Sequence, residues 1–407
     1  MRFNLIRNII FLILILTISC SKDEKEKSYT WFVSLEEAVS YNETYINNLI
    51  TSASSIYPGV NDFKSLVSGG VTVYKLIYKT EVDGKEIEAS GLVCIPSVPG
   101  EYPVLSFQNG TNTVNAYAPS NFAINTSYQM VEIMASMGYV VVIPDYPGFG
   151  ESSSIPHPYL ISEPTSRSII DMFYAVNELQ PAQFPEITIK NEYYLMGYSQ
   201  GGWATMVLHK AMELDYSDDF NLAGSVCGAG PYDIKYLFNT MTGVPTYSMP
   251  VYIGYIINSY LAYDQFTNPV TDILNQPYAS RLSSLFNGNL DFGSINNQLT
   301  TSISSLIQPE FLVGFETAAR YSSVREAMVR NSIAGYDTRK PLLLVHGGSD
   351  TQVNPQVTEF FYNEMIKAGT STTTCTKEIF PGLDHGDGVV PAVVRGLAFI
   401  RNIGAGQ

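Results

Sequence analysis

Positive charge and histidine are both scarce in this sequence. Its 407 residues include 23 lysines and arginines against 38 aspartates and glutamates, which gives a formal net charge of −15. This deficit argues against a nucleic-acid partner, and it offers no attraction to anionic lipid. Only four histidines are present, so a catalytic base must come from few candidates.

Cysteine is also rare, and its spacing suggests neither a metal site nor a disulfide framework. Cys94, Cys227 and Cys375 are expected to be buried in the core. We therefore expect no cofactor and no metal. Hydrophobic residues make up 45% of the chain, which is enough to form a sizeable core.

An apolar run near the N-terminus is too short to cross a membrane. It covers residues 9–18, whereas a span needs about 20 residues. Arg2 and Arg7 precede this run, as in an export signal. Residues 1–19 are therefore predicted to be a signal peptide.

The end of this segment resembles a lipobox, with Ser19 directly before Cys20. The resemblance implies that Cys20 is acylated and anchors the protein in the outer membrane. The next residues, "SKDEKE" at 21–26, resemble the lysine-acidic signal of lipoproteins displayed at the cell surface. The alternative is an ordinary secretory signal peptide with a chance cysteine.

Eight runs are typical of β-strands, and several of them are continuously apolar. They cover residues 71–82, 85–96, 103–108, 138–145, 192–199, 222–230, 340–347 and 374–380. Helical patterns occur at residues 127–137, 163–179, 200–214, 355–368 and 389–400. A hairpin with Asp83-Gly84 at its turn, followed by alternating strands and helices, predicts an α/β fold. Its eight-stranded sheet should be mostly parallel, with helices on both faces.

Two segments depart from this alternation. Ser34 and Glu37 match a capping box, which predicts a helix leading into the domain. The segment between the sixth and seventh expected strands is rich in tyrosine, and residues 236–263 carry no charge. It is predicted to be an inserted cap. The expected divisions are a tether and helix at residues 20–60, an α/β core at 61–230 and 335–407, and the cap at 231–334.

One serine lies between glycines where a strand gives way to a helix. The stretch "GYSQGG" places Ser199 two residues from both Gly197 and Gly201. This context is typical of a nucleophile elbow, in which a sharp turn projects the hydroxyl at the edge of a sheet. The alternative is a tight turn with a structural serine, and the sequence favours the nucleophile.

A serine nucleophile needs a base within hydrogen-bonding reach. His385 follows the last expected strand in a glycine-rich loop, and such loops gather at the carboxyl edge of the sheet. His209 lies ten residues after Ser199 in the same helix, about 15 Å away by helical rise, so it cannot reach. His346 is interpreted as structural and His157 as part of the pocket rim. His385 is therefore the predicted base.

The base needs a carboxylate that holds its tautomer. Asp350 follows the seventh expected strand and gives the chain order Ser199, Asp350, His385. Asp384 is the rival, but its side chain should point away from the adjacent histidine ring. Asp145 is interpreted as bracing its own turn.

An oxyanion hole needs two backbone N–H donors near the serine. Gln200 supplies one at the start of its helix, and "SFQNGTN" follows the third expected strand, where a second donor is needed. Thr111 is the candidate, with Asn109 and Gly110 as alternatives. An ordinary Asn-Gly turn is the other interpretation.

Five motifs together resemble the secretory lipase family, the lipase A type of α/β-hydrolase. They are "SFQNGT", "PDYPGFGES" with "HPYL", "GYSQGGWA", "VHGGSDTQVNP" and "GLDHGDG". The resemblance implies the α/β-hydrolase fold with its cap. It also implies that Ser199 is the nucleophile, Asp350 the acid and His385 the base, with Thr111 and Gln200 forming the oxyanion hole. Asn109 departs from the pattern, because many relatives have histidine there.

These features predict a serine carboxylic-ester hydrolase, a lipase or esterase that forms an acyl-enzyme with a small-molecule ester. The alternatives are a peptidase on the same triad and a non-catalytic surface binding protein on a hydrolase scaffold. Too few residues precede the first expected strand to form the propeller of large serine oligopeptidases. Within the cap, apolar residues such as Ile256 and Ile257 either roof Ser199 or fill the cap's own core. The acyl chain, the alcohol and the oligomeric state stay open.

Overall fold

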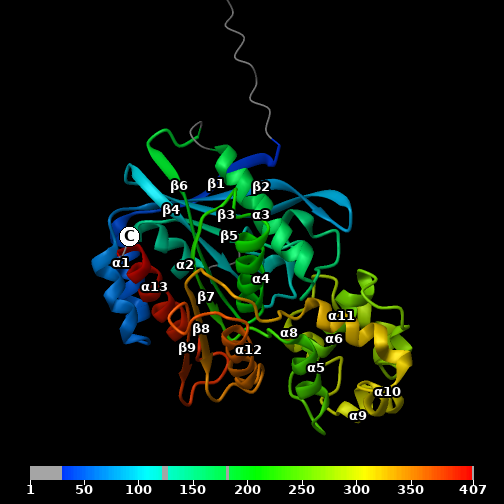
Figure 1. Ribbon diagram of the computed structural model, residues 1–407. Helices are drawn as coiled ribbons and strands as arrows, with labels where there is room; N and C mark the ends of the chain where they lie inside the picture. The colour runs from blue at the N-terminus through cyan, green and yellow to red at the C-terminus, as the bar shows by residue number, and fades with distance from the viewer. Residues whose placement is uncertain (1–29, 122–126, 180–182, 406–407) are drawn as a thin grey trace, which may run out of the picture.

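One nine-stranded sheet runs through the protein. The computed structural model describes residues 30–121, 127–179 and 183–405, drawn as a ribbon in Figure 1. The strand order is β1-β2-β3-β5-β4-β6-β7-β8-β9. The strands are β1 (Phe32–Tyr41), β2 (Val71–Val82), β3 (Lys85–Pro96), β4 (Gly100–Gln108), β5 (Val140–Pro144), β6 (Ile187–Tyr198), β7 (Leu222–Gly228), β8 (Leu342–Gly347) and β9 (Cys375–Phe380).

The eight expected strands are present as β2 to β9. Neighbours from β5 through β4 and on to β9 pair in parallel, whereas β1, β2, β3 and β5 pair antiparallel in turn. Every residue of β5, β7 and β8 is buried, as continuously apolar strands require when both faces are covered. The mostly parallel α/β fold is confirmed.

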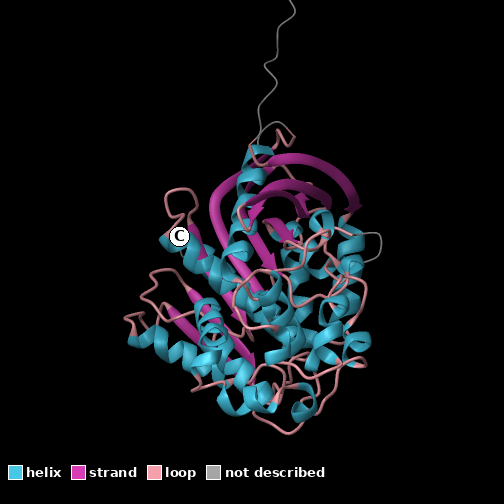
Figure 2. Cartoon of the chain, turned by 90° about the vertical axis from the view of Figure 1, so that its right-hand side faces the viewer, coloured by secondary structure: helices cyan, strands magenta, loops and turns pink. Residues whose placement is uncertain are grey.

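Helices cover both faces of the sheet, as Figures 1 and 2 show. One face carries α3 (Ser162–Leu179), α4 (Gln200–Leu214) and α12 (Gln356–Lys367). The other face carries α1 (Glu43–Ser54), η1 (Pro58–Leu66), α2 (Gln129–Glu132), η3 (Ile133–Met137) and α13 (Val389–Ala405). Each face buries its own apolar cluster. The sheet therefore separates two cores.

The insertion expected as a cap follows β7 and precedes β8. It contains α5 (Ile234–Thr242), α6 (Pro250–Ala262), η5 (Val270–Asp272), α7 (Tyr278–Leu285), α8 (Phe292–Asn296), α9 (Ile303–Leu306), α10 (Pro309–Gly314), η6 (Ala319–Tyr321) and α11 (Ser322–Asn331). Figure 1 shows these helices gathered at one end of the molecule. Their buried residues belong to the same apolar cluster as those of α3 and α4, so the cap and the body share one core.

The prediction of a helix that begins at Ser34 is wrong. This segment is β1, which pairs with β2 and adds a ninth strand at the sheet edge. The helix α1 begins later, where the Asn42 side chain accepts a hydrogen bond from the Tyr45 N–H at 2.8 Å. The apparent capping box of Ser34 and Glu37 forms no cap, because pairing with a distant strand outweighs a local helix signal.

Cys94, Cys227 and Cys375 are buried free thiols, as expected. Burial raises the pKa of each thiol, which makes all three poor nucleophiles. Cys20 lies outside the described residues. None of the helices in the described part of the chain has the length and apolar character that a membrane span requires.

Candidate active site

Ser199 occupies a sharp turn between β6 and α4. Its φ of 61° and ψ of −125° lie in a region that residues other than glycine rarely adopt. The Ser199 N–H donates to Gly228 O at 2.8 Å, and Ser199 O accepts from the Trp203 N–H at 3.1 Å. The surrounding backbone therefore holds the strained turn, which is the geometry of a nucleophile elbow.

The two flanking glycines are required by close backbone packing. A Cβ on Gly201 would lie 1.9 Å from Gln108 O, and a Cβ on Gly197 would lie 2.3 Å from Gly201 O. Any side chain at either position would push β4, β6 and α4 apart. The glycines thus allow the strand and the helix to meet directly beneath the serine.

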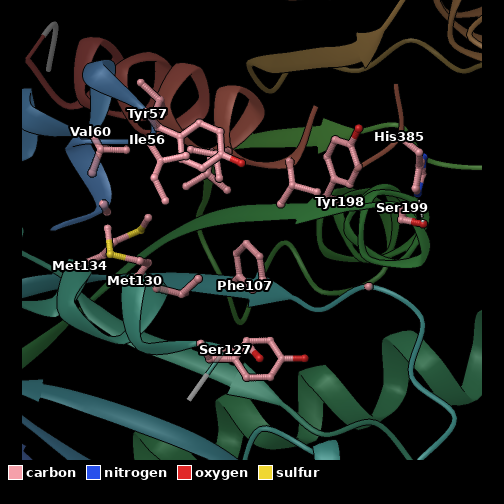
Figure 3. A pocket seen from close by; sticks show the side chains of 18 of the residues that line it. Ile56, Tyr57, Val60, Phe107, Ser127, Met130, Met134, Tyr198, Ser199 and His385 are labelled. Carbon is pink, nitrogen blue, oxygen red and sulfur yellow. Dashed lines mark hydrogen bonds between the residues drawn. The ribbon is translucent and has the colours of Figure 1, made fainter. Parts of the chain in front are cut away.

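Ser199, His385 and Asp350 form a continuous chain of hydrogen bonds. Ser199 Oγ lies 2.8 Å from His385 Nε2, and His385 Nδ1 lies 2.6 Å from Asp350 Oδ2. Figure 3 shows the serine beside the histidine ring. A carboxylate accepts hydrogen bonds, so His385 carries its proton on Nδ1 and accepts from the serine hydroxyl through Nε2. The three residues follow β6, β9 and β8, whose carboxyl ends meet at one edge of the sheet.

Asp350 is held as a carboxylate by several donors. Its Oδ1 accepts from the N–H groups of Gln352 at 2.8 Å and Val353 at 2.9 Å. Burial alone would raise the pKa of Asp350, but the hydrogen bonds from His346, His385 and Val353 outweigh it. The pKa therefore lies well below its ordinary value. Asp350 is ionised at neutral pH and can stabilise a protonated His385.

His346 has a larger part in this site than the sequence indicated. It is fully buried at the end of β8, and its Nε2 lies 3.1 Å from Asp350 Oδ2. The same Nε2 lies 2.9 Å from Val353 O, and because a carbonyl only accepts, Nε2 carries the proton and shares it between Val353 O and Asp350. Nδ1 lies 2.7 Å from Thr358 Oγ1, whose hydroxyl can donate to it. The interpretation of His346 as a satisfied structural histidine missed its contact with Asp350.

The other candidate acids and bases lie apart from the serine. Asp384 is exposed and accepts from the Asp387 N–H at 2.9 Å. Asp145 is buried and accepts from the hydroxyls of Ser90 and Ser120, so it braces its own turn as interpreted. His209 is buried, and its two ring nitrogens contact the hydroxyls of Ser225 and Thr338. It lies ten residues along α4 from Ser199, too far to act as its base.

His157 is a buried neighbour of Gln200 and does not form the rim of the cavity beside Ser199. Its Nδ1 lies 2.7 Å from Pro147 O, and its Nε2 lies 2.8 Å from Gln200 Nε2. Because a carbonyl only accepts, the proton is on Nδ1 and Nε2 accepts from the glutamine amide. Burial lowers the pKa of His157 to about 4, against the smaller effect of its two hydrogen bonds. The ring is therefore neutral and fixes the Gln200 side chain.

The start of α4 and the loop after β4 bring backbone groups to the serine. Gln200 is the first residue of α4, where N–H groups have no partner within the helix. Gly110 and Thr111 line the same cavity as Ser199, and a Cβ on Gly110 would lie 3.9 Å from Ser199 Cβ. Asn109 anchors this loop, because its side-chain amide donates to Pro144 O at 2.7 Å. Asn109 thus has a structural contact at the position where it departs from the family pattern.

A cavity of about 530 Å³ opens beside Ser199 and His385. The cap contributes only Tyr252 and Phe292 to the described residues that line it. Ile256 and Ile257 are fully buried in the apolar core shared by the cap and the body, and they do not line this cavity. The uncharged cap segment was expected either to roof Ser199 or to fill a core. The structure supports the second interpretation for these two residues.

No metal site is evident in the described part of the chain, where no group of three or more histidine, cysteine, aspartate and glutamate side chains could hold an ion. The side chains that meet at this edge of the sheet offer a hydroxyl, an imidazole and a carboxylate.

Comparison with known proteins gives a family and several proteins of the same fold. The profile of the secretory lipase family matches residues 116–385. A putative hydrolase from Legionella pneumophila superposes with a TM-score of 0.80 at 24% identity, over 92% of this chain and 98% of that one. The rice cell wall degrading esterase LipA from Xanthomonas oryzae gives 0.76 at 22%, over 91% and 96%. Candida antarctica lipase A in its closed state gives 0.69 at 16%, over 92% and 82%.

A comparison with curated protein sequences found no match. The fold and the hydrogen-bonded serine, histidine and aspartate define a serine hydrolase of the α/β-hydrolase class. The family profile covers most of the chain, and the chain belongs to the secretory lipase family. It is a carboxylic ester hydrolase.

Proposed function

We propose that Ser199, His385 and Asp350 are the catalytic residues with which this enzyme hydrolyses carboxylic esters. The observation that carries the proposal is the hydrogen-bond chain of 2.8 Å and 2.6 Å that joins them. A serine hydroxyl is a poor nucleophile until a base removes its proton, and His385 Nε2 lies where that proton must go.

The reaction proceeds through an acyl-enzyme. Ser199 Oγ attacks the ester carbonyl carbon while its proton passes to His385 Nε2, and Asp350 stabilises the resulting imidazolium. The histidine then donates this proton to the alcohol oxygen as the carbon–oxygen bond to the alcohol breaks. A water molecule attacks the acyl-enzyme by the same route, and the acid is released.

The negative charge on the carbonyl oxygen needs preorganised donors. We assign this role to the backbone N–H groups of Gln200 and Thr111, one at the start of α4 and one in the loop after β4. One such donor is worth about 2.7–4 kcal/mol of transition-state stabilisation. The hydrogen bond from Gln200 to His157 supports the assignment, because it restrains the residue that follows the nucleophile.

Hydrolysis of nitrophenyl esters tests the proposal. Ser199→Ala should lose up to about 10⁶ in turnover, because the three residues act as a unit. A fluorophosphonate probe should label the unaltered protein and not the variant. Retention of more than a tenth of the turnover by Ser199→Ala would overturn the assignment, and faster cleavage of amides than of esters would point to a peptidase.

We also propose that the protein is an outer-membrane lipoprotein anchored through Cys20 and displayed at the cell surface. The support is the short apolar run at residues 9–18, the lipobox-like Ser19 and Cys20, and the lysine-acidic segment after them. Cys20→Ser should abolish incorporation of a palmitate analogue in metabolic labelling. Continued incorporation into the variant would refute the anchor site.

A further inference from the structure

Tyr255 of the cap is hydrogen-bonded to the loop that carries Thr111. It lies in the middle of α6, is buried, and donates from its hydroxyl to Asn112 O at 3.0 Å. Asn112 directly follows Thr111 in the loop after β4. Neither Tyr255 nor Asn112 is among the described residues that line the cavity beside Ser199. The cap therefore holds this loop from outside the space that a substrate would fill.

Tyr159 forms a second contact between Tyr255 and the same loop. Its ring stacks on that of Tyr255, with centroids 4.2 Å apart and planes at 8° to each other. Its hydroxyl lies 3.0 Å from Thr111 Oγ1. Phe286, which follows α7 in the cap, also stacks on Tyr255, with centroids 4.7 Å apart. The two hydroxyls that reach the loop are thus carried by rings that support each other.

The direction of the Thr111 N–H depends on such contacts. Residues 109–113 belong to no helix or strand, so no regular ladder of backbone hydrogen bonds fixes their peptide groups. On the preceding side, Asn109 O accepts from the Tyr146 hydroxyl at 3.1 Å. On the following side, the loop is held by the two hydroxyls described above. Loss of the following contacts should let the Thr111 N–H turn away from the carbonyl oxygen of a bound ester.

Tyr255 also contacts the residue that restrains the second proposed oxyanion donor. The ring of His157 lies edge-on to the ring of Tyr255, with centroids 5.8 Å apart. His157 Nε2 accepts from the side-chain amide of Gln200 at 2.8 Å. One buried tyrosine of the cap therefore contacts a neighbour of each of the two donors.

We propose that Tyr255 is a positioning residue for the oxyanion hole. Its contacts with Asn112 and Tyr159 direct the Thr111 N–H toward the oxygen on which negative charge develops, so the cap takes part in catalysis without touching the substrate. The inference rests on the proposed assignment of the oxyanion donors. Removal of one such donor costs on the order of 10²–10³ in kcat, so a donor that is only loosened should cost about tenfold.

Tyr255→Phe keeps the ring and its stacking but removes the hydroxyl. We expect kcat for nitrophenyl acetate to fall about tenfold with KM unchanged, because a misdirected oxyanion donor affects the transition state and not substrate binding.

Tyr193→Phe is the matched control. Tyr193 is buried in β6 about 20 Å along the strand from Ser199, and its hydroxyl lies 3.2 Å from Asn177 Oδ1. This variant also loses one buried tyrosine hydroxyl, so its melting temperature should fall by a similar amount while kcat is unchanged. An unchanged kcat in Tyr255→Phe, or an equal loss in both variants, would overturn the proposal.

Inhibition by trifluoroacetophenone separates positioning from a general loss of structure. Ser199 Oγ forms a bond to the carbonyl carbon of this ketone, the π electrons move to the oxygen, and His385 takes the hydroxyl proton, so the adduct carries an oxyanion. Tyr255→Phe should raise the inhibition constant about tenfold. Acetophenone forms no stable adduct and should bind equally to both proteins. An unchanged constant for the fluorinated ketone would contradict the positioning role.

Tyr159→Phe tests the second contact and replaces Tyr255→Phe if that variant misfolds. It removes the hydroxyl beside Thr111 Oγ1 and should give the same pattern of lower kcat, unchanged KM and weaker inhibition by trifluoroacetophenone. Failure of the catalytic assignment would instead appear as turnover retained by Ser199→Ala. If Ser199→Ala is inactive and Tyr255→Phe behaves like Tyr193→Phe, only the positioning role is refuted.

Discussion

His346 and Asp350 are joined by a hydrogen bond of 3.1 Å that ends on Oδ2, the carboxylate oxygen that His385 also contacts. Two histidines therefore share one oxygen, one from inside β8 and one from the loop after β9. The buried ring is itself held by Thr358 at 2.7 Å. This arrangement holds the Asp350 carboxylate from the sheet side and leaves its other side to His385.

Replacement of Asp350 and of Asp384 should show which of the two carboxylates supports the catalytic histidine. Asp350→Asn should keep the fold but lower kcat about 10⁴-fold, because the amide can favour the wrong histidine tautomer. Asp384→Asn is the matched control, because the Asp384 carboxylate is exposed and accepts a hydrogen bond from the backbone N–H of Asp387 at 2.9 Å. Nitrophenyl ester kinetics and circular dichroism measure both effects. The opposite ranking would assign the acid role to Asp384.

His346 should act on the reaction through Asp350. His346→Phe keeps a ring but has no donor, so it removes a hydrogen bond that helps to hold the pKa of Asp350 low, and that pKa should rise toward its ordinary value. We expect kcat to fall about tenfold with KM unchanged, a loss of about 1.4 kcal/mol, which is close to the lower end of the range of about 1.5–3 kcal/mol for hydrogen bonds to charged groups. Thr358→Val, which keeps the His346 ring, should give a smaller change of the same sign. An unchanged kcat in His346→Phe would show that the contact has no effect on the reaction.

Glu132 should make stability depend on pH. Its side chain is fully buried, Tyr41 donates to Oε2 at 2.9 Å, and Oε1 has no partner among the described residues. Burial raises its pKa to about 7 from the ordinary 4.5, despite the opposing hydrogen bond from Tyr41. Between these values the folded protein retains a proton that the unfolded chain has released. Stability should therefore fall as pH rises through this window, by up to about 3 kcal/mol.

Urea unfolding at pH 5 and pH 8 measures this dependence. Glutamine has the shape of glutamate and cannot ionise. As the pH rises from 5 to 8, the free energy of unfolding of Glu132→Gln should therefore increase relative to that of the unaltered protein, by up to about 3 kcal/mol. Glu101→Gln, at an exposed position of β4, should show the same pH dependence of the free energy of unfolding as the unaltered protein. Equal pH dependence in all three proteins would contradict the assignment.

Ile256 should affect stability without affecting substrate choice. Because it is fully buried in the core shared by the cap and the body, Ile256→Ala should destabilise the protein by about 2–5 kcal/mol. The ratio of kcat/KM for long and short acyl esters should not change. Val313→Ala, at a cap position that is 87% exposed, serves as the control for thermal melting. A selective loss on long acyl esters would place Ile256 in contact with the acyl chain.

Local sequence patterns predicted the strands and the elbow well. The strands β2 and β3 were predicted residue for residue, because apolar runs and the Asp83-Gly84 turn are local signals. Gly197 and Gly201 also indicated their packing, since only glycine fits where backbones nearly touch. The first strand was missed because β1 exists only through its pairing with β2, which lies far along the chain.

The sequence by itself determined the fold class, the order of the candidate residues along the chain and the chemistry they offer, because these depend on residue type and short spacing. The tertiary structure alone decided which surfaces meet. It placed His346 against Asp350 and directed the cavity beside Ser199 toward α1 and α13 and away from the cap. The walls of the cavity come from segments distant in the chain, and they depend on how the helices pack on the sheet, which periodicity does not encode. His346 and Asp350 are only four residues apart, but their contact depends on the path of the loop after β8, which the sequence pattern does not encode either.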